Sequence, residues 1–209
     1  MGKPRGVPKH ECDMVFTKFI VPVLLAGFTL VAASPVPAPT PGVNVAIETS
    51  AGTFVVRLAT KVAPITTKHF LQLVDAKTYD GTSFYRTVSH ANEPASLIEV
   101  IQGGLNPQLA VAPKDMIPVE TTEKTGLHND NGAISMARTA DPNSASSEFF
   151  ICVGDNTFLD SQKFNDHQGY AVFGHVISGF DVVLRINHSP VSGQSLTPPV
   201  KIIRIRRAR

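Results

Sequence analysis

Short runs of strand-forming residues, separated by turn residues, constrain the fold of this chain most strongly. The runs are rich in β-branched and aromatic residues, which favours strands over helices. The expected strands are 45–49, 53–58, 83–88, 98–102, 133–137, 148–153, 170–177 and 200–206. Because most of these runs follow one another with no helix between them, the pattern disfavours a parallel α/β sheet. It predicts an all-β barrel or sandwich.

Two segments have the periodicity of a helix instead. Pro64 suits the first position of a helix, and an apolar stripe at helical spacing follows it. The stripe consists of Ile65, His69, Phe70, Leu73 and Val74. The second segment, 180–187, places Val183, Leu184 and Ile186 on one face. We expect these two helices to close the ends of the barrel or sandwich.

The first 42 residues differ in composition from the rest. Residues 19–33 carry no charge, follow a basic stretch and precede a proline-rich one, which is the layout of a signal peptide. The run is shorter than the roughly 20 apolar residues of a spanning helix. We expect residues 1–33 to be a signal peptide, 34–42 a linker and 43–209 the folded domain. Translation from Met14 would give the signal peptide an ordinary length.

Export would place the protein in the periplasm or outside the cell. The alternative is an uncleaved signal segment that anchors the protein, which is the one route to a membrane that the sequence suggests. We expect a monomer in either case.

The formal net charge of +2 comes entirely from the N-terminal segment. Residues 1–33 carry four basic and two acidic side chains, and the remainder is neutral, with 15 of each. A basic run does remain at the C-terminus, at Lys201, Arg204, Arg206, Arg207 and Arg209. We interpret it as the solvated face of a terminal strand and expect no nucleic-acid partner.

Cysteine and histidine form no recognisable metal or nucleophile motif. Cys152 lies in the apolar run 149–153, which predicts a buried thiol, and it would have no disulfide partner once Cys12 left with the signal peptide. No histidine pair has metal-ligand spacing, and nucleophile-elbow, phosphate-loop and dinucleotide motifs are missing. Residues 129–132 are typical of a turn, because they lack the alternating ligands of a calcium loop. We expect neither metal nor cofactor.

Five motifs, in this order, resemble the cyclophilin family of peptidyl-prolyl cis–trans isomerases. They are FYR at 84–86, IQGG at 101–104, ISMARTADPNSASSEFFICV at 134–153, FLD at 158–160 and GYAVFGHV at 169–176. The resemblance covers residues 43–207 and is most specific in the long central run. It implies a closed eight-stranded antiparallel barrel. It also implies a bacterial, exported member of the family that acts on proline-containing polypeptides.

The resemblance also assigns roles to individual residues. The family's active arginine falls on Arg86, whose guanidinium would hydrogen-bond the proline nitrogen as amide resonance is lost. The expected substrate contacts are Gln102, Glu99, Val100, Ala137, Arg138, Glu148, Phe150, Phe158, Leu159 and Tyr170. Among these, Val100, Phe150, Phe158 and Leu159 would hold the proline ring.

The sequence departs from the family pattern at three places. Residues 89–98 insert a polar loop, Glu99 and Val100 replace Phe and Met, and Glu148 replaces Gln. If Glu148 lies beside Arg86, it should accept hydrogen bonds from the guanidinium. These departures leave a binding-only proline-peptide module as the alternative to an enzyme. A purely structural exported domain is a third hypothesis.

The signal-peptide interpretation predicts where the mature chain begins. We expect an N-terminus close to Ser34, because the small residues Val31-Ala32-Ala33 suit a cleavage site. Mass measurement of the N-terminus of the exported protein checks this. Recovery of intact residues 19–33 in a membrane fraction would instead indicate an anchor.

Overall fold

Antiparallel strands dominate the computed structural model, which describes Gly2, residues 42–105 and residues 115–208. The predicted signal peptide and the linker up to residue 41 lie outside the described residues. The strands are β1 (Val43–Thr49), β2 (Gly52–Leu58), β3 (Ser83–Val88), β4 (Val100–Gly104), β5 (Ala133–Met136), β6 (Phe149–Cys152), β7 (Val172–Ser178), β8 (Val191–Ser192) and β9 (Ser195–Arg207).

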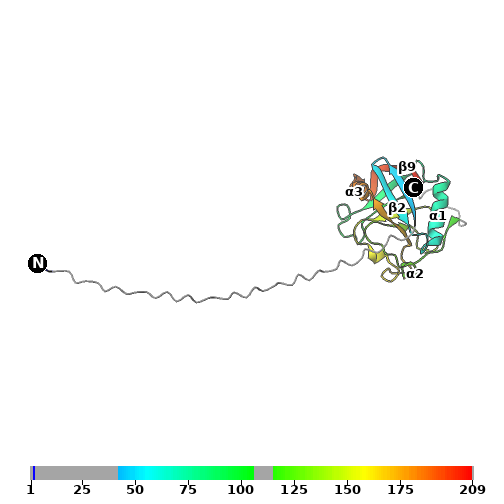
Figure 1. Cartoon of the computed structure of the whole chain (residues 1–209), viewed down its shortest axis with the longest axis horizontal. Helices are drawn as coiled ribbons and strands as arrows, with labels where there is room; N and C mark the ends of the chain where they lie inside the picture. Colours follow the sequence, from blue (N-terminus) through cyan, green and yellow to red (C-terminus); the bar gives the residue numbers. More distant parts are fainter. Residues whose placement is uncertain (1, 3–41, 106–114, 209) are drawn as a thin grey trace, which may run out of the picture. The chain divides into compact units, whose positions relative to one another are not determined.

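Eight of these strands close into a barrel (Figure 1). Their order is β1-β2-β7-β5-β6-β4-β3-β9, and β9 pairs with β1, so that Ile205 lies opposite Ile47. Every pairing is antiparallel. The predicted closed eight-stranded barrel is therefore confirmed. The two-residue β8 is an addition that forms a hairpin with β9.

The barrel interior is packed around Phe149. Its ring contacts Phe70, Tyr79 and Phe84 edge to face, with centroids 5.6, 5.5 and 5.7 Å apart. All four rings are fully buried. Edge-to-face packing places the positive edge of one ring against the negative face of another. The cluster therefore favours particular ring orientations in addition to burying apolar surface.

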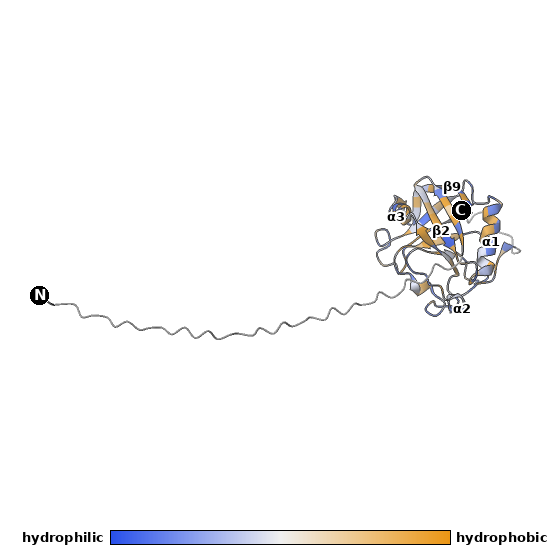
Figure 2. Ribbon diagram, viewed as in Figure 1, coloured by the Kyte–Doolittle hydropathy of each residue, from blue (hydrophilic) through white to orange (hydrophobic). Residues whose placement is uncertain are grey.

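The two predicted helices are present and lie on opposite sides of the barrel (Figure 1). α1 (Pro64–Asp75) starts at the expected proline, and α3 (Phe180–Asn187) has the expected bounds. Figure 2 shows the hydrophilic and hydrophobic sides of α1. A one-turn helix, α2 (Thr122–Thr125), and a 3-10 turn, η2 (Thr157–Leu159), are too short to give a periodic signal. No helix among the described residues has the length and apolar character needed to cross a membrane.

The N-terminus of α1 is capped from a distant segment. Ala63, at the N-cap position, has no polar side chain. The carboxylate of Glu120 instead accepts hydrogen bonds from the backbone N–H groups of Ile65 (3.1 Å) and Thr66 (2.8 Å). A negative charge there is favourable, because the first N–H groups of a helix lack internal partners.

Four residues of the basic run near the C-terminus, Lys201, Arg204, Arg206 and Arg207, lie in β9, as expected, and Arg209 lies outside the described residues. Three of its arginines bind carboxylates on neighbouring segments: Arg204 binds Glu48, Arg206 binds Asp80, and Arg207 binds Asp75 of α1. These pairs compensate much of the positive charge of the strand.

Cys152 is a buried thiol, as predicted. Burial raises its pKa above the usual value, and the negative charges of Asp130 and Asp160 act in the same direction. The thiol therefore stays protonated, which suits a packing role.

Candidate active site

A second apolar cluster lies outside the barrel, against the outer side of its wall. Successive side chains of a strand point to opposite faces, so Phe149 of β6 enters the core while Phe150 joins this outer cluster. The buried members are Val88, Val100, Ala133, Phe150, Cys152, Leu159 and Val172. One strand thus supports both the core and the floor of a surface pocket.

That pocket has a volume of about 130 Å³ and gathers most of the residues singled out from the sequence. Its lining consists of Arg86, Ile98, Val100, Gln102, Ala137, Arg138, Phe150, Leu159 and Tyr170. All except Ile98 were expected at the site. Ile98 comes from the inserted segment 89–98, which therefore contributes to the pocket wall.

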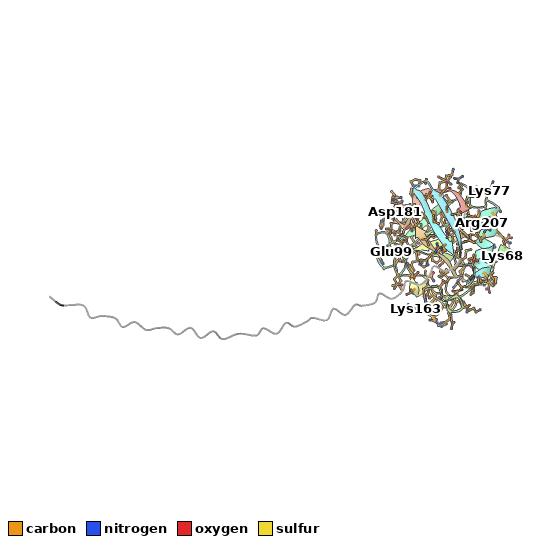
Figure 3. The ribbon with its side chains drawn as sticks, in the orientation of Figure 1. Lys68, Lys77, Glu99, Lys163, Asp181 and Arg207 are labelled. Carbon is orange, nitrogen blue, oxygen red and sulfur yellow. The ribbon has the colours of Figure 1, made fainter. Side chains whose placement is uncertain are left out.

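Glu99, Glu148 and Phe158 were also expected at the site, but they do not line the pocket. The Glu99 carboxylate accepts a hydrogen bond from the backbone N–H of His90 (3.0 Å), and Figure 3 shows Glu99 at the edge of the domain. Phe158 is 37% exposed and packs on Phe164, with centroids 5.7 Å apart. Neighbouring residues of a 3-10 turn point in different directions, so Leu159 faces the pocket and Phe158 does not.

A β-bulge in β3 sets the direction of the Arg86 side chain. Phe84 pairs with Gly103 and Arg86 pairs with Gln102, so Tyr85 is an extra residue without a partner on β4. Such a bulge breaks the strict alternation of side chains. As a result, Tyr85 and Arg86 both reach Gln102.

Two neutral amides hold the Arg86 guanidinium. Its Nη1 donates to Oε1 of Gln102 and its Nε donates to Oε1 of Gln194, both at 2.8 Å. Nη2 of Arg86 makes no hydrogen bond to another described residue. The guanidinium is thus held at two of its three nitrogens and keeps further donors for a ligand.

The expected hydrogen bond between Glu148 and Arg86 was wrong. Within the described residues, Oε2 of Glu148 accepts from the Tyr85 hydroxyl (2.5 Å) and from Nε2 of Gln102 (3.1 Å). The amide of Gln102 lies between the two charged groups and contacts both. Burial raises the pKa of Tyr85 most, and the hydrogen bond to Glu148 raises it further. The Tyr85 hydroxyl therefore stays protonated and remains a donor.

Arg138 forms one wall of the pocket without offering it an unpaired charge. Its side chain is 3% exposed and its guanidinium lies 4.7 Å from the ring centre of Tyr170. Its Nε donates to the carbonyl of Gly169 (2.8 Å) and its Nη2 binds the carboxylate of Asp166. Tyr170 in turn contacts Phe150 edge to face at 5.5 Å. Arg138 therefore holds an aromatic wall in place.

Four residues that shape the site escaped the sequence reasoning: Tyr85, Ile98, Asp166 and Gln194. Tyr85 belongs to the FYR motif, but strict alternation would turn it away from Arg86. Gln194 lies 108 positions from Arg86 and belongs to no motif. The described residues contain no group of three or more metal-ligating side chains.

The family model and the relatives described here belong to one family. The family model described as "Cyclophilin type peptidyl-prolyl cis-trans isomerase/CLD" matches residues 44–207. Peptidyl-prolyl cis-trans isomerase A of Dickeya dadantii is 36% identical over 197 residues, which cover 92% of this chain and 97% of the relative. Peptidyl-prolyl cis-trans isomerase cyp18 of Streptomyces antibioticus is 41% identical over 141 residues, covering 67% and 80%.

Solved structures share the fold at lower identity. A cyclophilin type peptidyl-prolyl cis-trans isomerase of Cryptosporidium parvum superposes with a TM-score of 0.68 at 22% identity, covering 81% of this chain and 99% of that one. A second structure of that protein, determined in the presence of the dipeptide Ala-Pro, gives a TM-score of 0.67 at 23% identity.

The Arg138–Asp166 pair predicts a pH-dependent stability. Burial alone would raise the pKa of Asp166, but hydrogen bonds from the backbone of Gln168 and Gly169 and from Arg138 outweigh it, so the pKa lies below its usual 3.8. The stabilisation is then present above that usual value and is lost as the pH falls through the lowered one. Asp166→Asn should cost about 1 to 2 kcal/mol at pH 7, less than for a fully buried pair, because water reaches the carboxylate.

Urea unfolding of parent and variant across this pH range measures the effect. The difference between the two proteins should shrink as the pH falls below the usual aspartate pKa of 3.8. Asp181→Asn, which breaks the exposed pair with Arg185, is the matched control and should change stability little. An equal loss for Asp166→Asn at every pH would contradict the assignment.

Proposed function

The chain belongs to the cyclophilin-type peptidyl-prolyl cis–trans isomerases, and we propose that it catalyses rotation about X-Pro bonds of exported polypeptides by electrostatic stabilisation from Arg86. The isomerase activity follows from the family. The role of Arg86 and the exported clients are the proposal. One observation carries it: the guanidinium of Arg86 lines the same pocket as the apolar side chains of Phe150 and Leu159.

The chemistry of the X-Pro bond explains why a guanidinium is useful there. Amide resonance gives a peptide bond a rotation barrier of about 18 to 20 kcal/mol. As the bond turns, the proline nitrogen becomes pyramidal and its lone pair localises. A charged donor beside that nitrogen hydrogen-bonds the lone pair in the transition state and gains little from the planar ground state. Arg86 therefore lowers the barrier without a covalent step or a cofactor.

The apolar part of the pocket binds the proline ring in this proposal. Phe150, Leu159 and Val100 are buried side chains of the outer cluster and supply the apolar surface. Gln102 and the backbone near Arg138 hold the rest of the peptide. The structure of the Cryptosporidium relative determined with Ala-Pro supports a proline-containing peptide as the ligand.

Export is the second part of the proposal. The signal-like segment 19–33, followed by a proline-rich stretch, supports secretion into the periplasm or beyond. In that compartment, the clients are proline-containing polypeptides that fold after crossing the membrane. The enzyme acts there as a monomer.

Replacement of Arg86 tests the catalytic role. Arg86→Ala should lower kcat/KM on a proline test peptide by about 100-fold, the usual effect of losing one donor to developing charge. Arg86→Lys should fail substantially as well, because a mobile ammonium does not reproduce the planar guanidinium. Thermal unfolding serves as the fold control. A folded Arg86→Ala variant with parental turnover would reject the role, and a parent that binds the peptide without accelerating exchange would favour the binding-only module.

Replacement of Glu148 tests how the nearby negative charge affects Arg86. Gln at this position can still accept from Tyr85 and Gln102 through one oxygen, as Oε2 of Glu148 does now. Glu148→Gln therefore removes the charge and keeps the geometry. We expect kcat/KM on a neutral peptide to rise a few-fold, because less of the guanidinium charge is compensated. A folded variant slower than the parent would mean that the carboxylate itself helps to orient Arg86.

A further inference from the structure

The inserted segment 89–98 reaches the guanidinium of Arg86 through one intervening side chain. Gln194, in the turn between β8 and β9, accepts from Nε of Arg86 through its Oε1 (2.8 Å). The Nε2 of the same amide donates to Oε1 of Glu93, in the inserted segment, at 3.2 Å. The contact between Glu93 and Arg86 is therefore indirect.

The segment and the turn are both tied to the end of β3, directly after Arg86. The Nδ2 of Asn92 donates to the carbonyls of Thr87 (3.0 Å) and Gly193 (2.9 Å). The N–H of Thr87 donates to the carbonyl of Gln194 at 2.9 Å. These bonds fix the position of the Gln194 backbone relative to Arg86. They do not determine which group of the Gln194 amide, its oxygen or its NH₂, faces Arg86.

An amide can present either its oxygen or its NH₂ group to a neighbour, and only the oxygen can accept from a guanidinium. Glu93 is an acceptor, so it holds the NH₂ group of Gln194 and leaves the oxygen for Arg86. Glu148 acts on Gln102 in the same way on the other side of the guanidinium. Each of the two amides is thus oriented by a carboxylate that makes no hydrogen bond to Arg86 within the described residues.

We propose that Gln194 and Glu93 are positioning residues for Arg86, and that the inserted segment is therefore a working part of the active site. This inference rests on the proposed catalytic role of Arg86. Bonds at Nε and Nη1 fix the plane of the guanidinium, so the donors left for the substrate are oriented before it binds. Because the contacting groups are neutral, the plane is fixed without a carboxylate in contact with the charge.

Steady-state kinetics on a proline test peptide gives the first test. Gln194→Met keeps the size of the side chain and replaces the amide by a weak acceptor. It should lower kcat about tenfold, as expected for one hydrogen bond to a charged group, with KM within about twofold. Glu93→Ala should lower kcat by about threefold, since Gln194 can still reach Arg86 part of the time.

Conservative and distant replacements are the controls. Glu93→Gln keeps an acceptor for Gln194 and should restore most of the turnover lost in Glu93→Ala. Glu123→Ala removes an exposed glutamate of α2 and should leave kinetics unchanged. An equal loss in Glu93→Gln and Glu93→Ala would mean that the charge of Glu93 matters and its hydrogen bond does not, which would overturn the positioning role.

The double variant shows whether Glu93 acts through Gln194. Once Gln194→Met has been made, Glu93→Ala should cause no further loss of kcat, because residues that share one path are not additive. If Glu93→Ala lowered kcat by the same factor in the parent and in Gln194→Met, Glu93 would not act through Gln194. Thermal unfolding of every variant separates these effects from damage to the fold, and Gln194→Leu replaces Gln194→Met if the latter is unfolded.

A measurement independent of turnover separates this inference from the proposed function. The Nε–H proton of Arg86 should exchange slowly with water in the parent and faster in Gln194→Met, as observed by NMR with Arg86→Lys to assign the signal. Slow exchange in a parent without isomerase activity would support the positioning and refute the catalytic role. An active parent in which Gln194→Met changes neither proton exchange nor kcat would refute the positioning alone.

Discussion

The alternation of side chains along β6 connects the stability of the barrel with the shape of its pocket. Phe149 stands at the centre of the interior aromatic cluster, and Phe150, the next residue, supplies the pocket floor. Only the backbone of β6 separates the rings of Phe149 and Phe150. Any shift of β6 that relieves the packing of one ring must move the other, so the pocket inherits its rigidity from the close-packed core.

Much of the fold could be predicted from the sequence, because it depends on local patterns. The strand runs and the helix that begins at Pro64 have short-range signals, and the family motifs supplied the closure of the barrel. The short elements α2 and η2 lack such signals. Strand β9 starts earlier than expected, at Ser195, because its first residues pair with β8 and β3. Those pairings depend on residues far away in the chain.

The candidate site was predictable in its members and less so in its geometry. Most of the pocket residues came from motifs, whereas the direction of each side chain depends on backbone irregularities. The bulge at Tyr85 brings two consecutive side chains to Gln102, and the turn at Phe158 directs that ring away from the pocket. Neither could be inferred from alternation. The predicted contact between Glu148 and Arg86 was wrong because the amide of Gln102 lies between the two side chains and bonds to both.

The pairing of the last strand with the first also determines when the barrel can form. β9 lies between β1 and β3 and pairs with both, so residues about as far apart as the domain allows must meet before the sheet closes. Contacts of such long sequence separation slow folding, because the chain entropy of a large loop is lost before the contact stabilises it. A nascent chain that still lacks β9 keeps the edges of β1 and β3 open to pairing with other chains. Pairing of β9 with both strands therefore removes the two open edges at which this barrel is most exposed to aggregation.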